Sequence, residues 1–245
     1  MSPAPNFNHL SRPYRWLEYL TFGTQLQRTR TQFLDSLHSN TNALALKALV
    51  LKALVLGDGD GRFTAALFAH HPAAQVHAID SSPAMLQLLT QRVKQTGHEH
   101  QFTTEQADLR HWTPAPGASY NLIATHFFLD CLTTQEVAIL ARRLNNATAP
   151  NALWLISDFA IPPGLFGRIV AAPIVALLYR SFALLTGLRI RQLPHHAAAL
   201  TTAGWTLVSE VPRLRGLLIS QLWQRNPSSP GVLTDSISES TAALK

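Results

Sequence analysis

The feature that most constrains the fold is a short apolar run that ends in three alternating glycines. The run covers residues 53–56, and the next five residues are Gly57, Asp58, Gly59, Asp60 and Gly61. Glycine lets the backbone turn sharply out of a strand and approach a ligand closely. In parallel α/β sheets, nucleotide-like ligands bind at such strand-to-helix turns. The sequence therefore predicts a buried strand followed by a ligand-binding turn.

Strand-like and helix-like segments alternate after this turn. The predicted strands are 53–56, 75–79, 101–106, 120–125 and 152–157, and the predicted helices are 62–69, 83–94 and 133–144. This alternation predicts βαβ units and a parallel sheet. A short helix over 195–203 and a hairpin of two strands, 205–211 and 217–223, complete the pattern.

The chain divides into one main domain and three segments in which strands and helices do not alternate. Residues 1–50 have helical spacing of apolar positions and form a predicted N-terminal extension. The main domain covers 51–226, and within it 161–192 is an apolar, arginine-containing helical insertion. Residues 227–245 are small and polar, which predicts a disordered tail.

Composition suits a globular protein, with 47% hydrophobic and 14% charged residues in 245. A single cysteine, Cys131, cannot form an intramolecular disulfide, which favours a reducing compartment such as the cytoplasm. The N-terminus lacks the pattern of a secretory signal. The stretch between Arg168 and Arg180 is shorter than the ~20 residues that cross a bilayer. We therefore expect a soluble, cytoplasmic protein.

The net charge of +6 is unevenly distributed. No acidic residue occurs from Phe159 to Ser209, and the arginines in that stretch are Arg168, Arg180, Arg189 and Arg191. Such a surface suits nucleic acid, an anionic substrate or anionic lipid, and a generally basic composition explains it equally well. A nucleic-acid-binding module is not recognisable, so no nucleic acid is expected. The histidine pairs lack the spacing and partners of a zinc site, so no metal is expected either.

The acidic residues of the glycine turn bear on the kind of ligand. A dinucleotide fingerprint places its third glycine at 62, where this chain has Arg62. Asp58 and Asp60 would repel a pyrophosphate, but they tolerate S-adenosylmethionine, which is cationic at sulfur and has no phosphate. Asp80 follows Gly61 by nineteen residues, where a carboxylate can accept hydrogen bonds from both ribose hydroxyls. The alternative for Asp80 is a helix cap or turn residue.

Three segments resemble the successive cofactor motifs of class I S-adenosylmethionine-dependent methyltransferases. They are VLGDGDGRF (55–63), AIDSSPAML (78–86) and QADLRHW (106–112). The resemblance covers about residues 51–225. It implies a Rossmann-like α/β fold with three αβα layers and a mostly parallel seven-stranded sheet whose last strand is antiparallel. The predicted terminal hairpin agrees with such a strand.

The resemblance also implies roles for individual residues. The glycine turn lies under the methionine moiety, Asp80 holds the ribose, and Asp108 beside Leu109 contacts the adenine amino group. The remaining residues that we expect at the cofactor are Ser81, Met85, Thr125 and Tyr14, the last as a lid. Ordinary core packing is an alternative for Met85 and Tyr14, and a surface loop for Asp108. The family usually has an acidic residue where this chain has Val55, and Asp58 or Asp60 is the candidate to replace its contact with the methionine amino group.

The catalytic candidates are His126 and Asp130, which follow the fourth predicted strand. Methyl transfer needs alignment of donor and acceptor and, for hydroxyl acceptors, removal of a proton. A histidine that titrates near neutral pH can act as that base. The alternatives are a structural role for His126 and a cap on the next helix for Asp130.

These observations predict methyl transfer from S-adenosylmethionine to a small, lipophilic or aromatic acceptor, with oxygen or carbon favoured as the accepting atom. The insertion 161–192 is interpreted as part of the acceptor pocket or as a helix that faces a membrane, and a plain helix covering the sheet is the alternative. A second hypothesis is a cofactor-binding partner subunit without catalysis. A third is a nicotinamide-dependent oxidoreductase. The oligomeric state and a peripheral membrane contact are left open.

Overall fold

The computed structural model describes residues 22–39, 50–186 and 193–226. Tyr14, the predicted lid, lies outside these ranges, as does the tail 227–245. The strands are β1 (Lys52–Leu56), β2 (Gln75–Asp80), β3 (Phe102–Gln106), β4 (Tyr120–His126), β5 (Thr148–Phe159), β6 (Trp205–Arg213) and β7 (Leu218–Arg225). The α-helices are α2 (Gln25–Thr31), α3 (Ser36–Ser39), α5 (Arg62–His70), α6 (Pro83–Thr96), α7 (Thr134–Asn145), α8 (Ala172–Thr186) and α9 (His196–Thr202).

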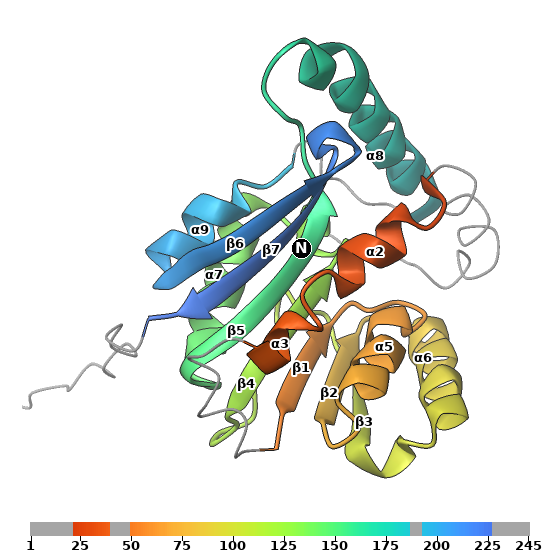
Figure 1. Ribbon diagram of the computed structural model, residues 1–245, viewed down its shortest axis with the longest axis vertical. Coiled ribbons are helices and arrows are strands. Elements are labelled where there is room, and N and C mark those ends of the chain that lie inside the picture. The colour runs from red at the N-terminus through yellow and green to blue at the C-terminus, as the bar shows by residue number, and fades with distance from the viewer. Residues whose placement is uncertain (1–21, 40–49, 187–192, 227–245) are drawn as a thin grey trace, which may run out of the picture.

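The seven strands form one sheet in the order β3-β2-β1-β4-β5-β7-β6. The first five of these are parallel neighbours, and β7 is antiparallel to both β5 and β6. The fold class predicted from the sequence is therefore confirmed, including the antiparallel last strand. Figure 1 shows α5 and α6 on one face of the sheet and α7 and α9 on the other.

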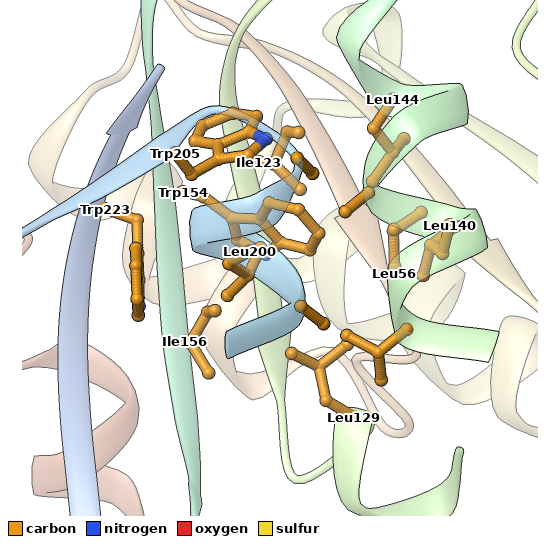
Figure 2. Packing of buried hydrophobic residues seen from close by; sticks show 14 of the residues in the cluster. Leu56, Ile123, Leu129, Leu140, Leu144, Trp154, Ile156, Leu200, Trp205 and Trp223 are labelled. Atoms are coloured by element: carbon orange, nitrogen blue, oxygen red, sulfur yellow. The ribbon is translucent and has the colours of Figure 1, made fainter. Parts of the chain in front are cut away.

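Two apolar clusters join the helices to the two faces of the sheet. One cluster packs α5, α6, α3 and the residues that follow α2 against one face of the sheet. Phe63, Leu67 and Leu34 are fully buried in it. The other packs α7 and α9 on the opposite face (Figure 2). In this second cluster the rings of Trp154 and Trp205 meet edge to face at 5.2 Å. The sheet is thus the middle of three layers, with helices packed on both of its faces.

Helix starts follow local sequence signals. Ser82 is the N-cap of α6, where its hydroxyl accepts from the N–H of Met85 at 3.3 Å, and Pro83 occupies the first turn. Thr133 and Glu136 form a reciprocal capping box at the start of α7. The alternative that Asp130 caps this helix is therefore wrong, because Thr133 does so.

Two boundaries differ from prediction by four residues. Strand β5 begins at Thr148, four residues before the predicted start, because Thr148 pairs with Tyr120 across an irregularity in the ladder. The insertion becomes helical only at residue 165, after Pro162, Pro163 and Gly164. Its first full turn is the π-helical η4 (Gly167–Ala171), which runs directly into α8. None of the helices in the described ranges is long and apolar enough to cross a membrane.

Candidate functional site

The glycine turn leaves β1 and lies directly against the segment that leaves β4. Gly57 has φ +67°, and its N–H donates to the carbonyl of Ile79 at 2.9 Å. A β-carbon at Gly57 would lie 2.4 Å from the ring of Phe128. Only glycine permits both this backbone angle and this close approach. Residue 57 therefore brings the β4 end, with the catalytic candidates, to the glycine turn.

Asp58 stabilises the start of α5. Its carboxylate accepts hydrogen bonds from the N–H of Phe63 at 3.2 Å and from the N–H and hydroxyl of Thr64 at 2.9 and 2.7 Å. Burial raises the pKa of Asp58, whereas these hydrogen bonds and the charge of Arg30 lower it, and burial prevails. The N–H groups at a helix start are the ones that bind a dinucleotide pyrophosphate. Because Asp58 occupies them here, the geometry disfavours the nicotinamide hypothesis.

Replacing Thr64 with valine is expected to lower the free energy of unfolding by about 2 kcal/mol. Valine keeps the shape of threonine but removes one of the hydrogen bonds to a buried carboxylate. Urea denaturation of the two proteins measures the difference. Thr90→Val is the matched control, because the Thr90 hydroxyl only bonds the carbonyl of Leu86 within its own helix. Equal losses in the two variants would contradict this role for Asp58.

Asp60 is held by two arginines. Its carboxylate lies 3.2 Å from Nε of Arg62 and 2.8 Å from Nη2 of Arg92, and Nε of Arg92 donates to the Asp60 carbonyl at 2.6 Å. Both acidic residues of the turn are thus engaged with protein groups. The prediction that one of them replaces the acidic residue missing at Val55 has no geometric support in this arrangement.

Asp80 ends β2 and is joined to the glycine turn. It is only 9% exposed, its Oδ1 accepts from the N–H of Ser82 at 2.8 Å, and the N–H groups of Gly59 and Ser81 also face its carboxylate. Burial raises the pKa of Asp80 to about 6, assisted by the charge of Asp58 and opposed by these N–H groups. The turn contact with Ser82 agrees with the alternative considered for Asp80. A carboxylate has about four lone-pair positions, so these three N–H groups leave acceptor capacity for a ligand.

The adenine-side candidates come from α6 and the segment after β3. Met85 is 9% exposed in the first turn of α6, and Leu109 is buried in the core on the α7 side. Asp108 is bound by Arg110, whose Nε and Nη2 donate to both carboxylate oxygens at 2.6–3.1 Å. Burial would raise the pKa of Asp108, but the hydrogen bonds and charge of Arg110 outweigh it and the pKa is lowered. The adenine contact predicted for Asp108 would have to be made beside this ion pair.

His126 ends β4 and is buried on the α5 side of the sheet. Its ring lies 4.2 Å from the ring of Phe63, and its Nδ1 lies 2.9 Å from the hydroxyl of Ser157. That hydroxyl donates to the carbonyl of Thr29 at 3.0 Å, so it accepts from His126, which leaves the unprotonated nitrogen at Nε2. Burial, with the charge of Arg30, lowers the pKa of His126 well below its usual value. His126 is therefore neutral, and its Nε2 has no hydrogen-bond partner among the described residues.

Thr125 points to the opposite face. Its hydroxyl is fully buried and accepts from the indole N–H of Trp154 at 3.0 Å. The side chain therefore belongs to the core, and only the backbone of Thr125 lies at the strand end. Its role at the cofactor stays a prediction.

Asp130 lies in the turn η3 (Leu129–Cys131) and is part of a buried acidic pair. The other member is Asp158, near the end of β5, which is 1% exposed. Burial raises the pKa of Asp130 to about 6, and hydrogen bonding by Cys131 opposes this. Burial and the charge of Asp130 raise the pKa of Asp158 well above its usual value. The N–H groups of Phe128 and Asp130 lower it somewhat, although neither oxygen of Asp158 has a hydrogen bond of good geometry within the described ranges.

Sequence reasoning missed two residues of the site, Asp158 and Arg30. Asp158 had a signal, since it is a charged residue at the end of the apolar strand β5. Arg30 of α2, whose guanidinium carbon lies 5.0 Å from the ring centre of Phe127, had none, because it reaches the site from a distant segment. Tyr179 belongs to the insertion that the sequence predicts at the acceptor pocket, and its hydroxyl donates to the carbonyl of Asp130 at 2.8 Å.

The acidic residues of the site lie at the carboxyl edge of the sheet. The pKa of the Cys131 thiol is raised well above its usual value by burial and then by the charges of Asp130, Asp158 and Asp80. Asp80 is thus close enough to act on the turn that holds Asp130. The structure brings together the glycine turn, the β2 carboxylate and the β4 turn. No cluster of three or more metal-ligating side chains occurs in the described part of the chain.

Comparison with known proteins agrees with this geometry. Residues 53–151 match the model of a family described as a methyltransferase domain. A malonyl-[acyl-carrier protein] O-methyltransferase of Halorhodospira halophila is 31% identical over 108 residues, which are 44% of this chain and 35% of the relative. The chain thus matches about a third of the length of this curated relative.

Solved structures show the same fold. The S-adenosylmethionine-dependent methyltransferase SibL superposes with a TM-score of 0.61 and 18% identity, over 92% of this chain and 63% of its own. Magnesium protoporphyrin IX methyltransferase of Synechocystis PCC 6803, solved with bound S-adenosylhomocysteine, gives 0.61 and 17%, over 90% and 96%. Residues 53–151 therefore match a methyltransferase domain, and the chain has the fold of S-adenosylmethionine-dependent methyltransferases.

Proposed function

We propose that this chain transfers a methyl group from S-adenosylmethionine to a small lipophilic or aromatic acceptor. The observation that carries the proposal is the joining of Asp80 to the glycine turn while Asp58 fills the helix start that a phosphate would need. This arrangement fits a nucleoside without phosphates. The methyltransferase match and the fold support the same ligand.

The charge of the site fits this cofactor. Buried carboxyls at Asp58, Asp80, Asp130 and Asp158 all have raised pKa values, because burial disfavours their charged forms. A cation placed among them stabilises those charged forms. In a chain of net charge +6, such an acidic site selects a ligand that carries a sulfonium and an ammonium group.

Each residue of the site would have a separate role in binding or alignment. S-adenosylmethionine supplies a methyl group on a positively charged sulfur. Asp80 would accept hydrogen bonds from the ribose hydroxyls, and Gly57 and Phe128 would set the distance between the cofactor turn and the β4 turn. Alignment by such fixed contacts is the main requirement of methyl transfer.

Of the two catalytic candidates, Asp130 is better suited to accept a proton. Its pKa of about 6 is near the working range of a general base at neutral pH. His126 is neutral, but its free Nε2 is enclosed beside Phe63 under α2. Removal of a hydroxyl proton by Asp130 favours O-methylation, and the O-methyltransferase activity named for the Halorhodospira relative is of that kind.

The acceptor is expected to be apolar because aromatic side chains flank the β4 turn. Phe127 contacts Phe159 at 5.3 Å between ring centroids, and Phe159 contacts Phe22 at 5.5 Å. Tyr179 adds a further ring next to Asp130. A cofactor-binding subunit without catalysis is the alternative that Val55 suggested, and the comparisons give it no support.

Mass-detected methyl transfer across a panel of phenols, quinols and lipid-like hydroxy compounds tests the function. We expect turnover with at least one apolar hydroxyl acceptor and a clear loss in Asp130→Asn, while His126→Gln retains activity. Binding of S-adenosylhomocysteine without transfer to any member of the panel would favour the non-catalytic alternative.

Cofactor binding is expected to weaken as the pH falls through 6. The free site holds Asp80 at a pKa of about 6, so its protonated form prevails below that pH. The ligand binds the ionised form, and its affinity at pH 5 should be about tenfold lower than at pH 8. Calorimetric titration with S-adenosylhomocysteine measures this. Asp80→Asn should flatten the dependence and Asp130→Asn should leave it largely in place, whereas an unchanged slope in Asp80→Asn would contradict the assignment.

A further inference from the structure

The helical insertion presents an apolar face to solvent. From residue 165 through η4 into α8, every fourth residue points outward. We call this row the outer face, and it consists of Leu165, Ile169, Pro173 and Leu177. The large side chains of the row are 75%, 68% and 65% exposed, in chain order. Val170, beside the row, is 39% exposed. Isolated exposed apolar residues are common on proteins, but a continuous row along one helix marks an interaction surface.

The opposite side of the same helix packs onto the protein. The inward row is offset from the outer face by two residues, about half a turn, and consists of Gly167, Ala171, Val175 and Tyr179. These residues are buried, and the last three belong to one apolar cluster with Phe159 and Leu218 of the sheet. The helix is therefore apolar on both sides, a pattern typical of a helix covered all round. Figure 1 shows it at the end of the sheet where β5 finishes, beside the turn between β6 and β7.

Arginines border the outer face. Arg168 and Arg180 are exposed and each follows a member of the row by three residues, which places it next to that member on the helix surface. Arg215, in the turn between β6 and β7, is exposed and lies 5.7 Å from the ring of Phe166. The sequence from Phe159 to Ser209 contains no acidic residue. An apolar row edged by cations alone is complementary to a surface with an apolar interior and anionic groups at its boundary.

We propose that the outer face docks on an anionic phospholipid bilayer, with the helix lying in the plane of the membrane. The apolar row would enter the boundary between headgroups and acyl chains, and the arginines would extend to the phosphates. The parallel orientation follows from the inward row, which stays packed on the sheet. This docking does not depend on methyl transfer, but it suits the proposed acceptor, because an apolar compound dissolved in the membrane would be close to the site.

A second copy of the chain fits this surface less well. A symmetric dimer places the same patch of each subunit against the other. Both patches would bring Arg168 and Arg180 into the interface, with no carboxylate between Phe159 and Ser209 to pair with them. A bilayer with anionic headgroups avoids this repulsion.

A direct contact connects the docking helix to the site. Tyr179 of the inward row donates its hydroxyl to the carbonyl of Asp130 at 2.8 Å. Movement of the helix on a membrane would therefore act on the turn after β4. The outer face itself has no part in the proposed cofactor contacts, so its substitution should leave cofactor binding intact.

Sedimentation of the full chain with vesicles tests the proposal. We expect binding to vesicles of phosphatidylcholine mixed with phosphatidylglycerol, and much weaker binding to phosphatidylcholine alone. Leu165→Gln/Ile169→Gln should reduce the partition coefficient tenfold or more, because two large apolar side chains no longer leave water. Arg168→Gln should reduce it about fivefold on the anionic vesicles only.

The matched control is Leu207→Gln/Val208→Gln on β6, where the two side chains are 41% and 47% exposed but lie away from the insertion. It should bind like the unaltered chain. A thermal shift with S-adenosylhomocysteine checks that each variant is folded and keeps its cofactor site. The proposal is overturned if the unaltered chain ignores anionic vesicles, or if both double variants bind equally. It is also overturned if sedimentation velocity shows a dimer that only Leu165→Gln/Ile169→Gln dissociates, which assigns the surface to a second copy.

Discussion

Replacing Asp80 with asparagine is expected to weaken the binding of S-adenosylhomocysteine about 100-fold. Asparagine keeps the shape of the side chain and the oxygen that accepts from Ser82. It removes the negative charge and the acceptor oxygen that would be left for a ribose hydroxyl. Hydrogen bonds to a charged group contribute about 1.5–3 kcal/mol each, so a loss of about 3 kcal/mol is expected, which corresponds to this change in affinity.

Isothermal titration calorimetry measures the effect, with Asp35→Asn as the control. Asp35 is an exposed carboxylate on the same side of the sheet, and its Oδ1 lies 3.3 Å from Nε2 of His70. Its variant should bind the ligand normally. Urea denaturation should show that Asp80→Asn remains folded. An affinity for the ligand that is unchanged in Asp80→Asn would remove the central support for the proposed function.

The fold was predictable because its signals are local. An apolar run before the glycine turn, Ser82 with Pro83 before a helix, and Thr133 with Glu136 before another each fix an element from a few adjacent residues. The early start of β5 was missed because Pro150 and Asn151 are poor strand formers. Only the pairing of Thr148 with Tyr120, a contact between distant segments, extends the strand to that point.

The site was predictable only where motif spacing determines it. Asp80 lies at the glycine turn because the carboxyl ends of neighbouring parallel strands meet at one edge of the sheet. The engagement of Asp58 by the start of α5 depends on how the turn folds back, which spacing does not reveal. Arg30 and Tyr179 come from helices that pack across the strand ends, and local pattern does not specify such packing.

The outcome for His126 illustrates the same limit. The sequence places this residue at a strand end, and residue type alone favours a base. In a strand, however, successive side chains point to opposite faces. His126 falls on the face covered by α5 and α2, where it bonds Ser157 and contacts Phe63. Which side of the strand end faces the acceptor depends on the layers around the sheet.

Alanine at Gly61 is expected to destabilise the fold by about 4 kcal/mol, and alanine at Gly59 by only about 1–2 kcal/mol. Both glycines have positive φ, +81° and +60°, so both variants carry the cost of a left-handed backbone. A β-carbon at Gly61 would also lie 2.9 Å from the Cα of Leu89, which is backbone of α6 and cannot rotate away. At Gly59 it would meet nothing within 4 Å. The difference therefore measures the packing of the turn against α6, separately from backbone strain.

The same pair of variants separates folding from ligand binding. The open space at Gly59 adjoins the carboxylate of Asp80, since the N–H of Gly59 faces that group. A methyl group there should reduce the affinity for S-adenosylhomocysteine while the protein stays folded. Urea denaturation gives the stability of each variant, and calorimetric titration gives the affinity of Gly59→Ala. Full affinity in Gly59→Ala would mean that the ligand does not pass over this part of the turn, because a cofactor lying there would contact the added methyl group directly.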